Sequence, residues 1–423
     1  MGRRAGTAAA ALLSLGLVAV AGCSATPDGG GASSGSGSTA TSPTSGPPTS
    51  SPGTTTSTTS TTSTRSGTPS TPSRTASASP NPTPSRAAPA EGSVRVVATL
   101  ATGIDVPWGL ASLPHGSVLV TARDSFQISR LDVGAGRLTR IGTVPGVVSN
   151  VDQQGEAGLL GIAVSPTFTR DKLVFVYFST ASDNRIASMT YDTTRPAGRQ
   201  LGALTVIVKG IPHNVHHNGG RLAFGPDGFL YATTGEAQQP SLAQDKGSLG
   251  GKILRMTTAG KPAPGNPFGT LVWTYGHRNV QGIAWDVAGR MWASEFGDHS
   301  EDELNLIQPG RNYGWPQTEG KTSRAGVTGP VAQWGPSEDS PSGIAIAGGS
   351  VWMAALRGQR LWRIPLDGAR LVADPQAFLV GRYGRLRSVL ALDDHTLLVT
   401  TSNRDGRRTP GPTDDRILLV TVG

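Results

Sequence analysis

Hydrophobic and polar residues alternate in a short sequence repeat that occurs six times between Trp108 and Asn403, and we call this repeat the repeated phrase. Each copy has a small apolar start, an apolar run of strand length, a turn, and a second apolar run that ends in polar residues. The third residue of its core, which is Ala111 in the first copy and Leu390 in the last, recurs at intervals of 52, 60, 61, 61 and 45 residues. Paired short strands at this spacing are typical of a β-propeller, with one hairpin per blade. The pattern therefore predicts an all-β fold, a six-bladed β-propeller.

The predicted hairpins place their ends on one side of the ring. In an antiparallel hairpin, the residue that begins the first strand and the residue that ends the second lie together, opposite the turn. Turns at Pro226-Asp227-Gly228 and Gly348-Gly349 mark the other side. Six hairpins in register would gather their end residues on one face. We expect the functional site on that face.

Residues 1–23 have the pattern of a lipoprotein signal peptide. Arg3 and Arg4 precede a small-apolar stretch over residues 7–20, which is too short to remain as a membrane span. The stretch ends in a Val-Ala-Gly-Cys sequence that resembles a bacterial lipobox, and Cys23 is the only cysteine in the chain. We expect Cys23 to be lipidated and to anchor an extracytoplasmic protein to the cell membrane; an ordinary secretory signal is the alternative.

Composition divides the rest of the chain into two parts. Residues 24–92 are mainly Ser, Thr, Pro and Gly, too poor in large apolar side chains to fold, and are predicted to form a disordered linker. Residues 93–423 form the predicted propeller. Of the net charge of +8, residues 1–92 carry +3 (five arginines against Asp28 and Glu91), which leaves +5 on the domain. No basic run accompanies this charge, so we expect no nucleic-acid partner.

The predicted strand ends on the shared face are rich in arginine, histidine and acids. Arginine suits bidentate capture of carboxylates or phosphates, although structural pairing with nearby glutamates is the alternative. A histidine at a strand start is a plausible general base. The acidic stretch 294–303 suits a hard cation such as Ca²⁺, without the spacing of an EF-hand. The strand-end residues are Trp108, Arg123, Asp124, Glu156, His216, His217, Glu236, Arg278, Asn279, Glu295, Arg357, Arg385, Arg387, Ser402 and Asn403.

Several longer motifs resemble one protein family. They are GEAGLLGIAVSP from Gly155, HHNGGRLAFGPDGFLYATTGE from His216, LGGKILR from Leu249, GHRNVQGIAW from Gly276, DELNLIQPGRNYGWP from Asp302 and GRLRSV from Gly384. Together and in this order they resemble the soluble glucose dehydrogenase and sorbosone dehydrogenase family, which includes aldose sugar dehydrogenases that use pyrroloquinoline quinone (PQQ). The resemblance implies a six-bladed propeller, as the repeats do. It also implies oxidation of an aldose at its anomeric carbon to the lactone, with hydride transfer to PQQ.

The resemblance also implies roles for single residues. His217, directly before Asn-Gly-Gly-Arg, matches the general base, and Arg278 matches the residue that stabilises negative charge on the cofactor oxygen. Arg385 and Arg387 match the pair that binds the cofactor carboxylates, and Arg357 stands where the family often has Lys. The implied cofactor-binding residues are Glu156, Asn279, Arg357, Arg385, Arg387 and Asn403.

Calcium is implied by the same resemblance. The backbone carbonyls of Gly297 and Asp298 match those that hold the cofactor's Ca²⁺. Asp298 replaces a proline of the family, which keeps the carbonyl but changes the stiffness of the backbone. Glu303 and Tyr313 match a region that carries a further structural Ca²⁺ in some members.

Two other classes of function compete with a sugar dehydrogenase. A metal-dependent lactonase on a six-bladed propeller needs several carboxylates or asparagines around a central metal, whereas the strand ends here are richer in arginine. A non-catalytic propeller would bind sugar or protein with its face. For a sugar dehydrogenase, we expect a small-molecule aldose as substrate and an electron acceptor that no motif identifies. We also expect a monomer whose only membrane contact is the lipid on Cys23.

Overall fold

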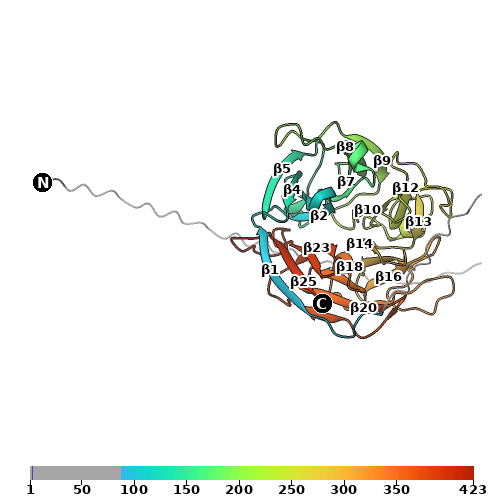
Figure 1. Ribbon diagram of the computed structural model, residues 1–423. Coiled ribbons are helices and arrows are strands. Elements are labelled where there is room, and N and C mark those ends of the chain that lie inside the picture. Colours follow the sequence, from blue (N-terminus) through green and yellow to red (C-terminus); the bar gives the residue numbers. More distant parts are fainter. Residues whose placement is uncertain (1, 3–86) are drawn as a thin grey trace, which may run out of the picture. The chain divides into compact units, whose positions relative to one another are not determined.

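The computed structural model describes Gly2 and residues 87–423, and residues 87–423 form a ring of six antiparallel β-sheets (Figure 1). The six-bladed β-propeller predicted from the repeats is therefore confirmed. The predicted signal peptide, Cys23 and residues 24–86 of the predicted linker lie outside the described residues. No helix in the described part of the chain is long and apolar enough to cross a membrane.

The first three blades each contain four strands that follow one another in the chain, from the innermost strand outward. Blade 1 contains β2 (Pro107–Ser112), β3 (Ser117–Ala122), β4 (Gln127–Asp132) and β5 (Arg137–Thr143). Blade 2 contains β6 (Leu159–Val164), β7 (Leu173–Ser179), β8 (Asn184–Thr190) and β9 (Thr205–Ile211). Blade 3 contains β10 (Leu222–Phe224), β11 (Leu230–Thr233), β12 (Lys252–Met256) and β13 (Val272–Tyr275).

The last three blades include the closure of the ring. Blade 4 contains β14 (Asn279–Trp285), β15 (Met291–Phe296), β16 (Asp302–Ile307) and β17 (Ala332–Trp334). Blade 5 contains β18 (Pro341–Ala347), β19 (Ser350–Ala355), β20 (Arg360–Asp367), β21 (Arg370–Leu371) and β22 (Gln376–Phe378). Blade 6 contains β23 (Leu386–Asp393), β24 (Thr396–Thr401), β25 (Ile417–Val422) and, from the other end of the domain, β1 (Val94–Ala101). The pairing of β1 with β25 ties the two ends of the domain together.

Helical segments in residues 87–423 are single turns. They are α1 (Phe168–Asp171) and the 3-10 turns Pro114–Gly116, Val151–Gln153 and Pro240–Ala243. Residues 88–92, assigned to the linker from sequence, contact blade 5. There the Arg363 guanidinium donates to the carbonyls of Pro89 (2.8 Å) and Ala90 (3.2 Å).

The glycine of the repeated phrase lets neighbouring innermost strands approach closely. A Cβ on Gly109 would lie 2.8 Å from the carbonyl oxygen of Leu160, and one on Gly282 would lie 2.5 Å from that of Ser342. Only glycine tolerates such an approach of backbone to backbone. The Thr121 hydroxyl uses this proximity and donates to the Leu160 carbonyl at 2.6 Å. The small residues of the phrase therefore set the narrow centre of the ring.

Apolar side chains fill the space between adjacent blades. Phe175 and Tyr177 of β7, for example, are fully buried in one cluster with Leu230 of β11 and Leu254 of β12. Burial of apolar area is worth about 25 cal/mol per Å², so each such side chain contributes on the order of 2 kcal/mol. This packing gives the loops at the strand ends a rigid base.

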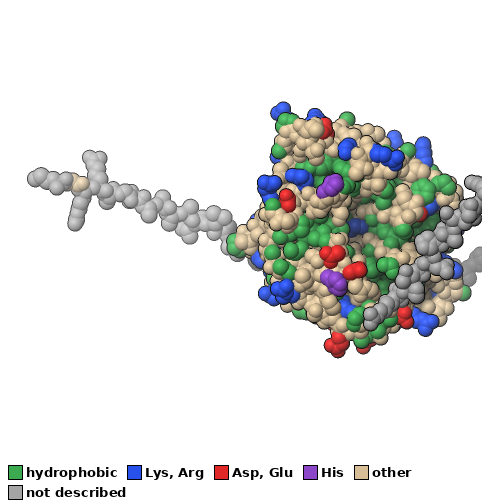
Figure 2. Space-filling view, in the orientation of Figure 1, with side chains coloured by type: hydrophobic (Ala, Val, Ile, Leu, Met, Phe, Trp, Pro, Cys, Tyr) green, Lys and Arg blue, Asp and Glu red, His purple; other side chains and the backbone are tan. Residues whose placement is uncertain are grey.

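Strand register confirms that the hairpin ends share one face. The first residues of β2, β6, β14, β18 and β23 pair with residues at the ends of β3, β7, β15, β19 and β24. We call this side the strand-start face and the side with the hairpin turns the opposite face. Figure 2 shows one face of the ring, with green hydrophobic side chains around a central depression and blue Lys and Arg side chains mostly at the periphery.

Candidate active site

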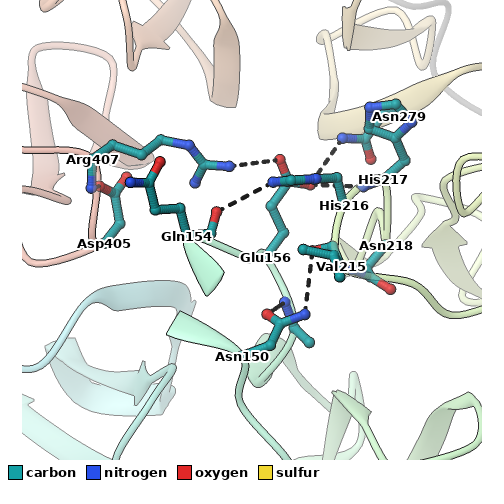
Figure 3. Close-up of polar contacts among 12 residues, drawn as sticks. Asn150, Gln154, Glu156, Val215, His216, His217, Asn218, Asn279, Asp405 and Arg407 are labelled. Carbon is teal, nitrogen blue, oxygen red and sulfur yellow. Dashed lines mark hydrogen bonds and ion pairs between the residues drawn. The ribbon is translucent and has the colours of Figure 1, made fainter. Parts of the chain in front are cut away.

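Loops of four blades bring predicted site residues together on the strand-start face. Figure 3 shows the carboxylate of Glu156 between His217, Asn279 and Arg407. Each comes from a different blade, because the loops that precede β6, β10 and β14 and the loop that follows β24 meet there. Together with the start of β23, these loops gather Glu156, His217, Arg278, Asn279, Arg385, Arg387, Asp405 and Arg407.

His217 forms a pair with a buried carboxylate. Its Nδ1 lies 2.5 Å from Oε1 of Glu236, whose side chain is 1% exposed. A carboxylate can only accept, so the proton of the neutral ring resides on Nδ1 and leaves Nε2 with its lone pair. The other oxygen of Glu236 accepts from the backbone N–H of Gln239 at 2.5 Å. The ring is thereby held in the tautomer that a general base requires.

Glu156 contacts His217, Asn279 and Arg407 through its two carboxylate oxygens. Its Oε2 accepts from the backbone N–H of His217 at 3.0 Å and from Nδ2 of Asn279 at 3.2 Å. Its Oε1 lies 3.6 Å from Nη2 of Arg407. Burial alone would raise the pKa of Glu156, but Arg407 and then His217 and His216 outweigh burial and hold that pKa below its usual value. Glu156 is therefore an anion that connects blade 2 with blades 3, 4 and 6.

Blade 6 contributes two arginines to the site, the half-buried Arg385 and the buried Arg387. Arg385 Nε donates to Asp405 Oδ2 at 2.7 Å. Arg387 is 3% exposed, and within residues 87–423 its side chain donates hydrogen bonds only to neutral oxygens, Gln281 Oε1 at 3.2 Å and Ser402 Oγ at 3.4 Å. Burial lowers the pKa of Arg387 to about 9. A buried guanidinium with long neutral contacts favours an anionic ligand, which would compensate its desolvation.

Arg278 closes the blade 4 side of the site. Its backbone N–H donates to Glu295 Oε1 at 2.6 Å, and its Nη2 donates to Asp298 Oδ1 at 2.6 Å. Its guanidinium carbon lies 5.3 Å from the ring centroid of Trp315. Its Nε is buried and has no hydrogen-bond partner within the described residues. A buried donor without a partner is costly, so this atom is available to a ligand oxygen.

Two of the predicted calcium-binding groups, the Gly297 carbonyl and the Glu303 carboxylate, are engaged by other contacts. The Gly297 carbonyl accepts from Nη1 of Arg278 at 2.5 Å, and a cation would compete with that guanidinium. Glu303 accepts from Asn305 (2.9 Å) and from the Gly320 N–H (2.7 Å). In residues 87–423 no group of three His, Cys, Asp or Glu side chains is arranged to hold a metal ion. The Gly297 carbonyl and the Glu303 carboxylate do not fit Ca²⁺ as they are arranged, so calcium stays a prediction and no chemical step below depends on it.

The loop that carries Asp298 is held by a single carboxylate oxygen. Oε1 of Glu319 accepts from the backbone N–H groups of four successive residues, 298–301, at 2.6 to 3.1 Å. Successive N–H groups that converge in this way form an anion-binding nest. The nest fixes the backbone next to Arg278.

Three predicted site residues are engaged elsewhere or stand apart. Asn403 accepts from the Arg385 N–H at 2.9 Å and donates to the Tyr383 carbonyl at 2.9 Å, so it supports the backbone of Arg385. Tyr313 stacks on His277, with ring centroids 4.6 Å apart, and donates to the Leu306 carbonyl. Arg357 is exposed in the turn between β19 and β20 and makes no ion pair within residues 87–423.

Sequence reasoning assigned no role to four residues that the structure places in the site. Glu236 was recognised only as a strand-end residue, and its partner His217 could have been inferred from their shared hairpin end. Gln281 follows Asn279 by two positions on β14, so the alternation of strand side chains gives a signal for it. Asp405 and Arg407 lie in the loop between β24 and β25, which has no periodicity from which their direction could be read.

Comparison with known proteins gives consistent matches over the ring. A family profile described as Glucose / Sorbosone dehydrogenase matches residues 104–417. The PQQ-bound form of aldose sugar dehydrogenase from Streptomyces coelicolor is 58% identical with a TM-score of 0.78, over 80% of this chain and all of that chain. Aldose sugar dehydrogenase YliI of Escherichia coli is 29% identical over 76% of this chain and 92% of that protein. The uncharacterized protein slr1608 of Synechocystis is 31% identical over 72% of this chain and 83% of that protein.

Proposed function

Because this chain belongs to the glucose and sorbosone dehydrogenase family, we propose that it is a PQQ-dependent oxidoreductase that oxidises the anomeric carbon of an aldose to the lactone. The pair formed by His217 and Glu236, together with the buried Arg387 that has no ion-pair partner within the described residues, is the observation that supports this chemistry most directly. The similarity to a PQQ-bound aldose sugar dehydrogenase supports the choice of cofactor.

The arginines fit an anionic planar quinone. PQQ carries three carboxylates, and Arg387 is a buried cation whose hydrogen bonds within the described chain go to neutral oxygens. Arg385 and Arg387 would hold carboxylates of the cofactor, and the unpartnered Nε of Arg278 would meet one of its oxygens. When bound, the quinone supplies the acceptor for the hydride that leaves the anomeric carbon.

The protein's own residues move the proton. His217 Nε2 would take the proton of the anomeric hydroxyl while the C–H bond breaks, which leaves a C=O bond in the lactone. Glu236 keeps Nδ1 protonated and stabilises the imidazolium that forms. General-base assistance of this kind contributes about 10²–10⁴-fold in rate.

Reconstitution tests the proposed function. The purified cofactor-free chain is titrated with PQQ, with and without Ca²⁺, and then assayed by dye reduction with a panel of aldoses. We expect saturable uptake of PQQ and sugar-dependent reduction. The variant His217→Ala should bind PQQ and lose at least about 10²-fold in turnover. His216→Ala is the matched control, because the one hydrogen bond of that ring within the described residues goes to the Gln154 carbonyl, at 3.3 Å, and its centroid lies 6.4 Å from that of His217. Uptake of PQQ without oxidation of any aldose would contradict the proposal.

We also propose that Cys23 carries the lipid anchor of an extracytoplasmic enzyme, on the strength of the lipobox-like sequence that it ends. Expression in a host that lipidates proteins, followed by membrane fractionation, tests this. The wild-type chain should sediment with membranes and Cys23→Ala should be released. Equal release of both would contradict the anchor.

A further inference from the structure

Four exposed arginines lie in adjacent loops of blades 5 and 6 on the strand-start face. Within residues 87–423 none of the four takes part in an ion pair, although most other arginines near the site do. None is buried by a neighbouring blade. We call this group the arginine rim; it consists of Arg357, Arg382, Arg404 and Arg408.

Contacts between the loops show that the arginine rim is continuous. Arg408 Nη1 donates to Gln359 Oε1 at 3.3 Å, which joins the loop after β24 to the turn after β19. The Gly381 N–H donates to the Gln359 carbonyl at 2.9 Å, which brings the loop before β23 to the same turn. Gly384 leaves room for the Arg408 guanidinium, because a Cβ there would collide with it. Three separate stretches of sequence thus form one surface.

The charge on this surface is not balanced by acids of the same loops. Asp405 is buried against Arg385, Asp414 is paired with Arg416, and Asp415 is buried and accepts hydrogen bonds from backbone N–H groups. Glu338, whose backbone carbonyl lies beside Gly358, is exposed and forms no ion pair within residues 87–423. The arginine rim therefore presents a net positive surface to solvent. Clustered charge of one sign raises association rates of opposite charges by about 10–10³-fold.

The arginine rim adjoins the mouth of the candidate site. Arg407, between Arg404 and Arg408, lies 3.6 Å from Glu156, and Asn403 of the same loop holds the backbone of Arg385. A neutral aldose has no need of positive charge outside its pocket. Oxidation of one aldose to its lactone, however, releases two protons and two electrons, and an acceptor that docks beside the site would take up the electrons.

On these grounds we propose that the arginine rim is the docking surface of a negatively charged one-electron acceptor. Two acceptor anions, each gaining one electron, take up the two electrons released with each lactone. This inference rests on the proposed function and names the partner class of the same site.

Two metal complexes of opposite charge test the inference as sole acceptors at saturating sugar. They are hexacyanoferrate(III), a trianion, and hexaammineruthenium(III), a trication. Salt is raised from about 10 mM to about 150 mM, which shortens the Debye length from about 30 Å to about 8 Å. We expect the second-order rate constant to fall with salt for the anion and to rise or stay constant for the cation.

A charge-reversal pair localises the effect. Arg382→Glu with Arg408→Glu alters the arginine rim, and Arg199→Glu with Arg370→Glu makes the same change of net charge on the opposite face, where β8 and β20 end. We expect the rim variant to lose about tenfold in the rate constant for hexacyanoferrate(III), with an unchanged KM for sugar. The control pair should lose less than about twofold. Thermal unfolding checks that both pairs are folded.

A binding measurement needs no turnover. Hexacyanocobaltate(III) has the same charge and shape as hexacyanoferrate(III) and is redox-inert. Calorimetric titration of the PQQ-loaded protein, whose cofactor site is filled, should show binding that weakens about tenfold in the rim variant and not in the control.

Several outcomes would overturn the inference. One is an equal response of both acceptors to salt, and another is an equal loss in both variant pairs. A third is a change confined to the KM of glucuronate, which would assign the arginine rim to an anionic substrate. Failure of the proposed function is distinct, because then neither complex would be reduced with any aldose.

Discussion

His217 Nδ1 lies 2.5 Å from Oε1 of Glu236, across the two ends of a single hairpin. His217 has a φ of 59°, a conformation that non-glycine residues rarely adopt. It is held there from both sides, because the His217 N–H donates to Glu156 and the Ala237 N–H donates to the His217 carbonyl at 3.0 Å. Such strain persists where surrounding contacts enforce it, often at functional sites. The imidazole is therefore fixed before a substrate arrives.

Replacement of Glu236 by glutamine tests the tautomer argument. The amide can donate as well as accept, so it no longer selects the ring with its proton on Nδ1. We expect Glu236→Gln to lower kcat at least about tenfold with little change in PQQ affinity. Steady-state kinetics and a PQQ titration measure the two effects, with the exposed Glu91→Gln as control. A kcat equal to that of wild type would show that Glu236 does not act on His217.

The blade 6 arginines should control cofactor affinity. Charge-assisted hydrogen bonds to buried groups contribute about 1.5–3 kcal/mol each. We therefore expect Arg385→Ala with Arg387→Ala to weaken PQQ binding by about 10²-fold or more. Absorbance titration of the cofactor-free protein measures the affinity, and Arg199→Ala, exposed on the opposite face, is the control. Unchanged affinity would remove the assignment of these residues to the cofactor carboxylates.

Asp339 should make stability depend on pH. Burial and then the nearby Asp302 raise the pKa of Asp339 well above its usual value, and they outweigh the lowering effects of Trp362 and Arg360. An unfolded aspartate titrates near about 3.9. The contribution of Asp339 to stability is therefore complete below about pH 4 and is lost as pH rises through the higher native pKa.

The variant Asp339→Asn isolates this effect, because an amide is neutral at every pH. We expect the variant to become more stable relative to wild type as pH rises from about 4 to 8. The difference in unfolding free energy should grow by an amount on the order of 1–3 kcal/mol, which raises the Tm of the variant relative to that of wild type. Thermal unfolding at several pH values measures the difference, and the exposed Asp374→Asn is the control. A Tm difference that is constant with pH would contradict the assignment.

Lys252 should stabilise the loop that carries Glu236. Its buried ammonium donates to the carbonyls of Leu242 (2.6 Å), Ala243 (3.0 Å) and Gly250 (2.5 Å). Methionine has a similar shape but leaves all three carbonyls without this donor, so Lys252→Met should cost about 3 kcal/mol or more. Urea denaturation measures the loss, with the exposed Lys261→Met as control. A loss as small as that of the control would show that the three contacts do not stabilise the fold.

The positions of Gly109 and Gly282 show which features of the fold can be predicted from short stretches of sequence. The spacing of the repeated phrase gives the number of blades, and its glycines mark where innermost strands touch. Alternation along each hairpin gives the face on which its two ends lie. His217, Arg278 and Arg387 could thus be assigned to one face from the sequence, because strand pairing and turns are decided within about 20 residues.

Contacts between blades were decided only by the tertiary structure. Glu156 meets Arg407 because the ring brings blade 2 beside the loop between β24 and β25, and that loop has no repeat from which its course could be read. The Gly297 carbonyl accepts from Arg278, and the nest around Glu319, which lies far along the chain from Arg278, fixes the backbone that follows Gly297. Local patterns encode strands and turns, whereas loop conformation and side-chain partners depend on how six blades pack around one axis. The sequence by itself therefore determined the scaffold and the face, and the closed ring decided which charges are paired and which are left for a ligand.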